Sequence, residues 1–296
     1  MKTLIAGSNG MVGSAVTRHL IESGHEVVRL VRHTPGPGEI WWNPDGGEMD
    51  TAGLDGVEGV VHLATMRWPM RWTAKAKEKI HANRLATNRL LAESLSGCEN
   101  KPSVLICASG MGYYPSSGDN EITEDSPAGV SFLAQMQRDG EAATVAASEA
   151  GIRVVHLRIP PVLGGRALQQ VGFQAGDGQQ WMSWVGRDEL ASIIDFALKT
   201  ETLAGPVNAV SPNPLRNAEF AKVATQALEQ KSGGIMPAFI VRLVMGEMGE
   251  ELILGSRRIQ PAKLLAAGYT FRFPKLDEAL RHEKDMLKMD LVSQPA

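Results

Sequence analysis

The stretch that decides the fold is Lys2-Thr3-Leu4-Ile5-Ala6-Gly7-Ser8-Asn9-Gly10-Met11-Val12-Gly13. A short apolar run leads directly into three glycines spaced three residues apart, and an amphipathic helix is expected over residues 11–22. In such a strand–turn–helix unit, the first glycine permits the tight turn and the second lets the backbone approach a phosphate. The third glycine lets the helix lie close to the strand. The helix N-terminus adds free N–H groups and the positive end of its dipole.

These features together favour a site for the diphosphate of a dinucleotide. By itself, the glycine triplet also fits an ordinary strand–turn–helix with flexible glycines. Its position favours the binding site, because the triplet closes the first strand and opens the first helix. The residues expected to hold the cofactor in this stretch are Gly7, Asn9, Gly10, Met11, Val12 and Gly13.

The composition is that of an ordinary globular protein. The chain has 296 residues, of which 43% are hydrophobic and 21% are charged, with a formal net charge of −3. This balance gives no electrostatic footprint for nucleic acid or acidic membranes. The two cysteines, Cys98 and Cys107, do not suggest a disulfide framework, and no apolar run approaches the ~20 residues of a membrane helix. We therefore expect a soluble, cytoplasmic protein with a small-molecule substrate and with no nucleic-acid or membrane partner.

Strand-like and helix-like segments alternate through the first two-thirds of the chain, which is typical of a parallel sheet covered on both faces. Strands are expected at residues 3–6, 26–31, 39–42, 59–63, 103–108, 153–157 and 206–210. Helices are expected at 11–22, 73–96, 131–149, 187–199, 217–229, 237–248, 261–267 and 275–287. Thr73 and Ser131 are candidate N-caps.

The alternation predicts an α/β protein with a Rossmann-type doubly wound parallel sheet and a smaller, mostly helical C-terminal portion. We expect an NADP-binding domain over residues 1–215, in which residues 164–186 contribute to the substrate side. A smaller helical domain on the substrate side is expected over residues 216–296. The irregular loops at 110–128 and 164–182 follow strands of the sheet, where ligands collect.

The end of the second strand indicates which nicotinamide cofactor is bound. A carboxylate at this position hydrogen-bonds the ribose 2′-hydroxyl of NAD, whereas an arginine accommodates the 2′-phosphate of NADP. Here the strand ends in Arg32-His33-Thr34, with no acidic residue at its tip. The forked guanidinium of Arg32 suits a phosphate, although a solvated arginine at a strand end is common. We expect NADP to be preferred, with NAD possible.

Four further motifs carry a family resemblance. They are G-V-V-H-L-A-T at 59–65, N-R-L-A-T at 83–87, L-I-C-A-S at 105–109 followed by a tyrosine pair, and L-R-I-P-P-V-L-G at 157–164. With the glycine loop, they resemble the NAD-dependent epimerase/dehydratase family of the extended short-chain dehydrogenase/reductase superfamily. The resemblance implies that Ser109 is the catalytic serine. The cofactor-binding residues that it implies are Leu63, Ala64, Thr65, Asn83, Ala108, Ile159, Pro160 and Val162.

A narrower resemblance covers nearly the whole chain. Gly112-Tyr113-Tyr114, the stretch G-D-G-Q-Q-W-M-S-W at 176–184 and the segment 246–274 resemble an epimerase-like subgroup with a C-terminal domain of unknown function. The chain differs at residues 140–141, where Gly-Glu replaces the subgroup's Trp-Glu, and at 185–186, where Val-Gly replaces Ile-His. The stretch between residues 165 and 176 is shorter than the family's usual substrate loop, which favours a smaller or more open pocket.

The largest departure from the superfamily is the missing Tyr-x-x-x-Lys pair. In the superfamily this lysine lowers the pKa of the tyrosine, which relays a proton to or from the substrate oxygen. None of the three tyrosines of this chain has a lysine four residues later. On the corresponding helix, the two positions fall at about Leu133 and Gln137. Leucine has no proton to give, and a neutral amide does not lower a neighbour's pKa.

Ser109, Tyr113 and Tyr114 are the candidate catalytic residues that remain. A serine hydroxyl at a strand end can hydrogen-bond a carbonyl oxygen, and a tyrosine can donate the proton that accompanies hydride transfer. The same residues also fit a structural role, as a strand-end hydrogen bond and as loop packing. General acid catalysis is typically worth ~10²–10⁴-fold, so turnover can survive without the activated tyrosine.

Candidate substrate residues follow the G-V-V-H-L-A-T motif at 59–65 and lie in the stretch at 176–184. Trp68 can wall a pocket, Arg71 can reach an anion, and Trp181 belongs to the subgroup's specific motif. Most tryptophans are also explained by core packing. No metal site is expected, because His62 and His156 lie on predicted buried strands without a partner at metal-ligand spacing.

Two functions from different classes fit this sequence. The first is an NADP(H)-dependent oxidoreductase or epimerase-like enzyme that lacks the Tyr/Lys pair and acts on a small carbonyl, hydroxyl or sugar-nucleotide-like substrate. The second is a catalytically weak or inactive NADPH-binding sensor. Turnover that Ser109→Ala blocks would remove the second, and binding without any product would favour it. The substrate, the reaction direction and the oligomeric state stay open.

Overall fold

The computed structural model describes residues 1–66 and 71–292. Its centre is a sheet of eight strands in the order β13-β8-β6-β5-β1-β2-β3-β4. The strands are β1 (Lys2–Ala6), β2 (Glu26–Val31), β3 (Glu39–Asn43), β4 (Glu48–Met49), β5 (Gly59–His62), β6 (Val104–Gly110), β8 (Arg153–Ile159) and β13 (Gly205–Asn208). Every pairing is parallel except that of β3 with β4. The predicted Rossmann-type fold is confirmed.

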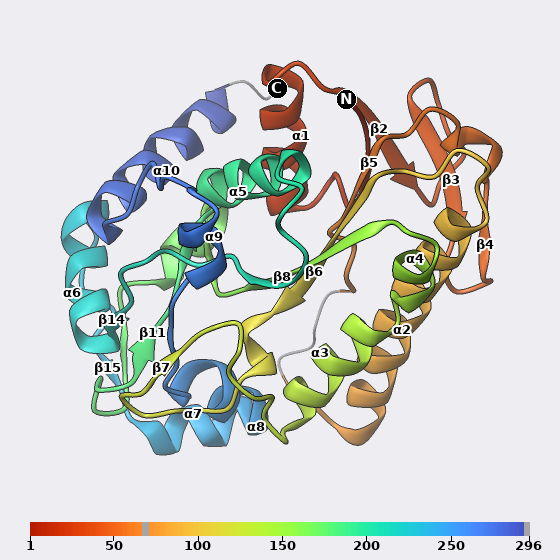
Figure 1. Ribbon diagram of the computed structural model, residues 1–296. Coiled ribbons are helices and arrows are strands. Elements are labelled where there is room, and N and C mark those ends of the chain that lie inside the picture. The colour runs from red at the N-terminus through yellow and green to blue at the C-terminus, as the bar shows by residue number, and fades with distance from the viewer. Residues whose placement is uncertain (67–70, 293–296) are drawn as a thin grey trace.

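Helices cover both faces of this sheet (Figure 1). On one face lie α1 (Met11–Glu22) and α5 (Arg187–Lys199), and on the other lie α2 (Ala74–Ser96), α3 (Phe132–Ala142) and α4 (Val145–Glu149). Successive strand residues point to opposite faces, so Ile5 joins the apolar core under α1 and α5 while Leu4 joins the core under α2. Burial on both faces explains why the strands read as continuous apolar runs.

Side-chain caps mark the starts of α2 and α3. The hydroxyl of Thr73 accepts from the N–H of Ala76, and that of Ser131 accepts from the N–H of Ala134, so both predicted N-caps are confirmed. The helix expected at 131–149 is instead divided into α3 and α4. At the break, the hydroxyl of Thr144 donates to the carbonyl of Glu141 at 2.8 Å. A threonine hydroxyl that bonds the backbone in this way competes with helix continuation.

The C-terminal portion adds helices beside the sheet. These are α6 (Asn217–Leu228), α7 (Ala238–Met245), α8 (Glu247–Gly249), α9 (Ala262–Ala266) and α10 (Leu276–Val292). The helix expected at 237–248 is interrupted at Gly246, between α7 and α8, and α10 extends beyond the expected end at 287. Short strands tie this portion to earlier segments: β7 (Glu121–Ile122) pairs with β16 (Arg258–Ile259), β10 (Gln174–Ala175) with β15 (Ile235–Met236), and β11 (Trp181–Met182) with β14 (Leu215–Arg216).

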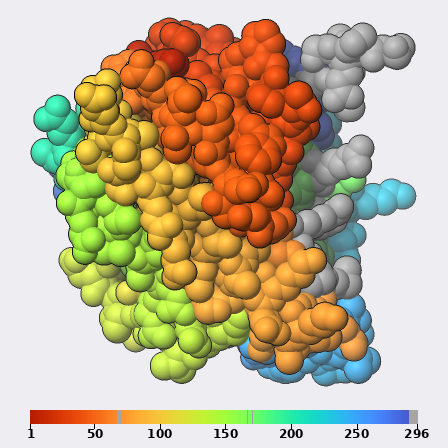
Figure 2. Space-filling view, turned by 90° about the vertical axis from the view of Figure 1, so that its right-hand side faces the viewer, coloured from red at the N-terminus to blue at the C-terminus, as the bar shows by residue number. Residues whose placement is uncertain are grey.

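These pairings bring residues on either side of position 215 together, so the domain division at that point stays a prediction. One more short pairing joins β9 (Val162–Leu163) to β12 (Val185–Gly186) within the first part of the chain. A separate apolar cluster connects the C-terminal portion with α2 and α3, because Met248 and Leu252 pack against Trp72 and Ile80. In Figure 2, blue C-terminal residues accordingly lie beside the orange α2 at the lower edge of the molecule. Within the described residues, no helix has the length and apolar character needed to cross a membrane.

Candidate functional site

The glycine loop is packed so closely that two of its residues have no room for a side chain. Gly7 has φ +85°, and a Cβ there would lie 2.7 Å from the backbone nitrogen of Ala64. A Cβ at Gly13 would lie 2.0 Å from the carbonyl oxygen of Gly7. The N–H of Gly10 donates to that same carbonyl at 3.1 Å. The turn therefore holds the first amides of α1 at the carboxyl edge of the sheet, which is the arrangement of a phosphate cradle.

A pocket of about 430 Å³ opens beside this loop. Its walls come from the ends of β1, β2 and β5, which are neighbours in the sheet. The predicted cofactor residues that line it are Gly7, Asn9, Gly10, Arg32, Leu63, Ala64 and Thr65. The next three predicted residues, Met11, Val12 and Gly13, form the first turn of α1.

Arg32 provides the positive charge at this pocket. It is exposed at the end of β2, and its guanidinium carbon lies 5.8 Å from the centroid of the Trp42 ring. His33 also lines the pocket, and its Nε2 lies 3.2 Å from the Glu39 carboxylate. Glu39 is held from the other side by Arg29 at 2.9 Å. Trp42 could not be singled out from the sequence, because its approach to Arg32 depends on the register of β2 and β3.

The second half of the site lies at the end of β6. Ser109 is buried there, and its Oγ donates to Oε1 of Glu141 at 2.7 Å. Oε1 of Gln137 lies 3.3 Å from the same hydroxyl. Leu133, one helical turn earlier, contacts Gly112, where an added Cβ would lie 3.0 Å from the Cβ of the leucine. The two positions assigned to the missing Tyr/Lys pair therefore face the strand end, and neither carries a group that titrates.

A bidentate ion pair fixes Glu141. Arg158, on the neighbouring strand β8, donates from Nε to Oε1 at 3.0 Å and from Nη2 to Oε2 at 2.9 Å. The guanidinium lies 3.4 Å above the centroid of the Tyr113 ring. Its Nη1 also donates to the hydroxyl of Tyr114 at 2.8 Å. Both predicted tyrosines therefore contact Arg158 in this structure and help to fix its position.

In this structure the hydroxyl of Tyr114 is engaged by contacts within the protein, and its role as a proton donor to substrate stays a prediction. Its side chain is fully buried, and its hydroxyl donates to Oδ1 of Asn208 at 2.7 Å while accepting from Arg158. Burial raises the pKa of Tyr114 to about 12, because the charged phenolate is poorly solvated. These contacts favour a structural role for Tyr114. Tyr113 is half-buried and stays a candidate.

The two predicted substrate residues within the described part of the chain, Arg71 and Trp181, have different partners. Arg71 donates to the carbonyls of Leu243 and Val244, so its guanidinium caps the C-terminal end of α7 in this structure instead of facing an anion. Trp181 donates to Asp119 at 2.9 Å and belongs to the short strand β11. Trp68 lies outside the described residues.

The remaining cofactor candidates surround the end of β6. Ala108 precedes the serine, and Ile159 of the neighbouring strand β8 is the register partner of Gly110 in β6. Pro160 follows that strand, Val162 pairs with Val185 in the short β9–β12 ladder, and Asn83 lies half-buried on α2. In the sheet, β6 and β8 lie on the other side of β5 from β1, whose end carries the glycine loop.

Three charged residues of the site were not assigned a role from the sequence. Glu141 and Arg158 form the ion pair described above, and Arg84 on α2 donates to the carbonyl of Ala108 at 2.8 Å. One signal could have indicated Arg158, since an arginine within an apolar strand must find an acid partner when it is buried. The identity of that partner depends on how α3 lies against β8.

Two buried side chains near the sheet are poorly suited to chemistry. Burial, followed by the charge of Arg84, lowers the pKa of His62 to about 3, and the ring stacks edge-on against Trp42. Burial raises the pKa of Cys107 to about 12, so its thiol stays protonated and unreactive.

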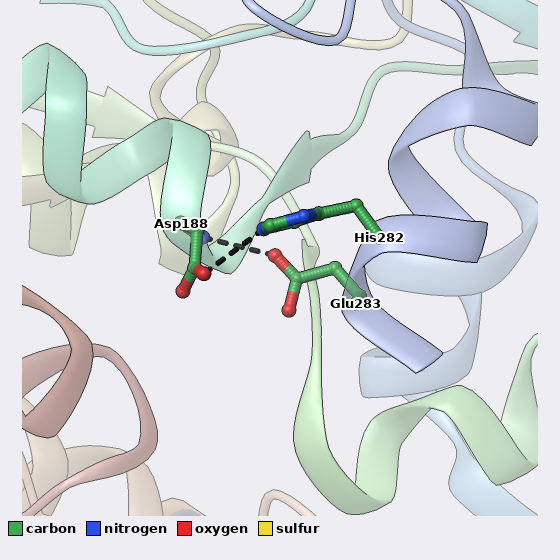
Figure 3. A group of neighbouring side chains, drawn as sticks. All are labelled: Asp188, His282 and Glu283. Atoms are coloured by element: carbon green, nitrogen blue, oxygen red, sulfur yellow. Dashed lines mark hydrogen bonds and ion pairs between the residues drawn. The ribbon is translucent and has the colours of Figure 1, made fainter. Parts of the chain in front are cut away.

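A second cluster of titratable groups lies where α10 meets the start of α5 (Figure 3). His282 and Glu283 point from α10 toward Asp188, and their ligand-type atoms lie within 4.8 Å of one another. Arg18 pairs with Asp188 at 2.9 Å, and Arg187 lies 3.4 Å from Glu283. Because two guanidinium groups already balance these carboxylates, the cluster fits an ion-pair network better than a cation site.

The fold and the two halves of the site define a Rossmann-type nucleotide-binding protein. The sequence profile of the NAD-dependent epimerase/dehydratase family matches residues 3–209, and that of a domain of unknown function matches residues 236–283. The chain therefore belongs to the NAD-dependent epimerase/dehydratase family. This finding confirms the resemblance, including the separate C-terminal match.

Several relatives match over nearly the whole chain. An epimerase family protein of Mycobacterium leprae is 35% identical over 290 residues, which cover 94% of each chain. The crystal structure of the human epimerase family protein SDR39U1 (isoform 2) with NADPH superposes with a TM-score of 0.87 at 30% identity, over 96% of this chain and 99% of that one. A nucleoside-diphosphate sugar epimerase from Corynebacterium glutamicum gives 0.81 at 33% identity, over all of this chain and 62% of that one.

Proposed function

We propose that this protein is an NADP(H)-dependent oxidoreductase or epimerase-like enzyme acting on a small hydroxyl or carbonyl compound, such as a sugar nucleotide. The observation that carries the proposal is the glycine loop without side-chain space, beside a pocket with the exposed Arg32. The similar human protein that was crystallised with NADPH and the similar sugar epimerase support the cofactor and the substrate class.

The residues of the pocket fit a dinucleotide. Only glycine fits at positions 7 and 13, because a Cβ there would clash with the backbone. The glycines thus allow the tight turn that presents the first amides of α1 to a diphosphate. Arg32 offers a forked cation to a 2′-phosphate, and the residues that follow β2, Arg32-His33-Thr34, include no acid. When bound, a nicotinamide would supply a hydride or accept one.

The chain's own residues provide the polar side of the reaction. Ser109 stands at the end of a central strand, where it can hydrogen-bond the oxygen of a substrate. Arg158 and Glu141 fix its orientation from behind. Gln137 and Leu133 cannot activate a proton donor, so we expect slow turnover relative to an enzyme with the Tyr/Lys pair.

The cofactor assignment is tested by replacing Arg32 with Gln. We expect NADPH affinity to fall by about tenfold or more, while NADH affinity changes little, because only NADPH carries the phosphate that the guanidinium would hold. Isothermal titration calorimetry with both nucleotides measures this. Equal losses for NADPH and NADH would contradict the assignment. Replacing Arg89 of α2, which is also exposed, is the matched control, and it should change neither affinity.

The second candidate function is an NADPH-binding protein without turnover. The observation in its favour is that Leu133 and Gln137 occupy the positions of the catalytic pair. A screen of carbonyl, alcohol and sugar-nucleotide panels separates the two functions. Turnover that Ser109→Ala abolishes supports the enzyme, whereas nucleotide binding without any product across the panels favours the sensor.

A further inference from the structure

The hydrogen bonds of Ser109 determine what kind of group it can meet. A hydroxyl carries one proton and two lone pairs. The Ser109 proton is directed inward, to Oε1 of Glu141 at 2.7 Å, and the second neighbour within reach is the amide oxygen of Gln137 at 3.3 Å. Because the proton is already used, the free valences of Oγ are lone pairs. Ser109 therefore presents an acceptor to a ligand, and an acceptor selects a hydroxyl over a carbonyl oxygen.

Glu141 can only accept in this arrangement. Both of its oxygens accept charge-assisted hydrogen bonds from the Arg158 guanidinium, at 3.0 Å and 2.9 Å. Although burial opposes it, Glu141 raises the pKa of Arg158, so the guanidinium stays charged. The direction of the Ser109 bond thus holds whichever way the Gln137 amide is turned.

The surrounding contacts keep the pair in this geometry. Arg158 is held by the hydroxyl of Tyr114 at 2.8 Å and lies over the ring of Tyr113. The Tyr114 hydroxyl is in turn fixed by Asn208. A chain of five side chains, Asn208, Tyr114, Arg158, Glu141 and Ser109, therefore fixes the serine hydroxyl at the end of β6.

We propose that Ser109 and Glu141 form the proton-accepting pair of this site and that the substrate binds as a secondary alcohol. This inference rests on the proposed function. The substrate O–H bond breaks and its proton passes to Oγ of Ser109, while the Ser109 proton passes to Oε1 of Glu141. The electron pair left on the substrate oxygen forms the carbonyl as the C–H bond breaks. A nicotinamide dinucleotide, acting as oxidant, takes the hydride, and Glu141 later releases its proton to water.

In this scheme Ser109 is the catalytic residue and Glu141 is a positioning residue that acts through it. The pair replaces the missing tyrosine as proton acceptor. It also accounts for Gln137, since a lysine at that position would place a donor and a positive charge beside the serine.

A thiol placed at position 109 tests the proposal without a known substrate. Ser109→Cys is made in a Cys98→Ser background, and its alkylation by iodoacetamide is followed against pH by mass spectrometry. Cys107 stays silent because burial keeps it protonated. We expect the thiol to be alkylated. The midpoint pH of alkylation should be at least about one unit higher in the Ser109→Cys protein than in the same protein with Glu141→Gln added, because a neighbouring carboxylate disfavours the thiolate.

Three results would overturn the proposal. Absence of alkylation would mean that small molecules do not reach this atom, as a purely structural serine predicts. Equal midpoints in the two variants would mean that position 109 does not share its proton with Glu141. If the Glu141→Gln variant does not fold, a midpoint at or below the ordinary cysteine pKa of ~8.5 in the single variant decides against the pair.

Failure of the proposed function gives a different result. NADPH is added to the alkylation reaction, and protection of the thiol is expected if the nucleotide occupies the neighbouring cleft. Alkylation with the expected pH dependence but without protection would leave the Ser109–Glu141 pair standing and would contradict the cofactor assignment. Protection by NADPH with equal midpoints in the two variants would support the cofactor assignment and would contradict the Ser109–Glu141 pair.

Discussion

Replacing Gly7 with alanine should damage both the fold and the cofactor site. Gly7 has φ +85°, a conformation that costs an L-residue about 1–2 kcal/mol. Its new Cβ would also lie 2.7 Å from the backbone nitrogen and 2.9 Å from the Cα of Ala64. Backbone atoms cannot move aside as a flexible side chain would, so a further ~1–3 kcal/mol of overpacking is expected.

Gly24 supplies the matched control, because it has φ +82° and no heavy atom within 4 Å of the position of an added Cβ. Gly24→Ala should therefore cost only the conformational term of about 1–2 kcal/mol. Gly7→Ala should cost about 2–5 kcal/mol in total. Urea denaturation of both variants measures the difference, which isolates the close approach of β1 to the segment after β5.

NADPH binding completes this experiment. The strain at Gly7 displaces the amides of the first turn of α1, so we expect Gly7→Ala to weaken NADPH by at least about tenfold and Gly24→Ala to leave it unchanged. Calorimetric titration gives both values. Equal stability and equal affinity in the two variants would refute the packing argument at the glycine loop.

Two more predictions concern buried polar groups. Burial raises the pKa of Glu283 from 4.5 to about 7, so its contribution to stability is complete below pH 4.5 and is lost as the pH rises through 7. The free energy of unfolding of Glu283→Gln, relative to that of the native protein, should therefore rise by about 3 kcal/mol between pH 4.5 and 9 in denaturation experiments. A flat difference between the two proteins would count against this assignment. Tyr114→Phe should cost about 1–3 kcal/mol of unfolding free energy, because Asn208 loses its donor and Arg158 an acceptor, yet NADPH affinity should stay within about twofold. Wild-type stability combined with loss of turnover would return Tyr114 to a direct role in the chemistry.

The parallel sheet could be predicted because its signals are local. Each predicted strand contains a short apolar run between turn residues, and the glycine loop marks the first crossover. The two-residue β4 (Glu48–Met49) has no such run and was not predicted. The boundaries of α1 and α5 agree with those expected at 11–22 and 187–199. The break between α3 and α4 was missed, since it depends on the side-chain bonds of Thr144, one of which reaches His156 on β8 at 2.8 Å.

The site could be predicted only in part, because it too depends on side-chain contacts between distant segments. Motif positions placed Ser109 at a strand end, but the partner of its hydroxyl, Glu141, is 32 residues away on a helix. Arg71 looked free to meet an anion until the fold brought the end of α7 against it, 172 residues later in the chain. Contacts between distant segments decide whether a polar side chain is available, and periodicity carries no information about them.

The central claim is that the glycine loop and Arg32 hold a phosphorylated pyridine nucleotide. The most direct test is calorimetric titration of the native protein with NADPH and with NADH. We expect one NADPH per chain and a dissociation constant at least about tenfold lower than that for NADH, because Arg32 would hold the additional phosphate. The absence of heat and of any thermal shift with either nucleotide would contradict the account.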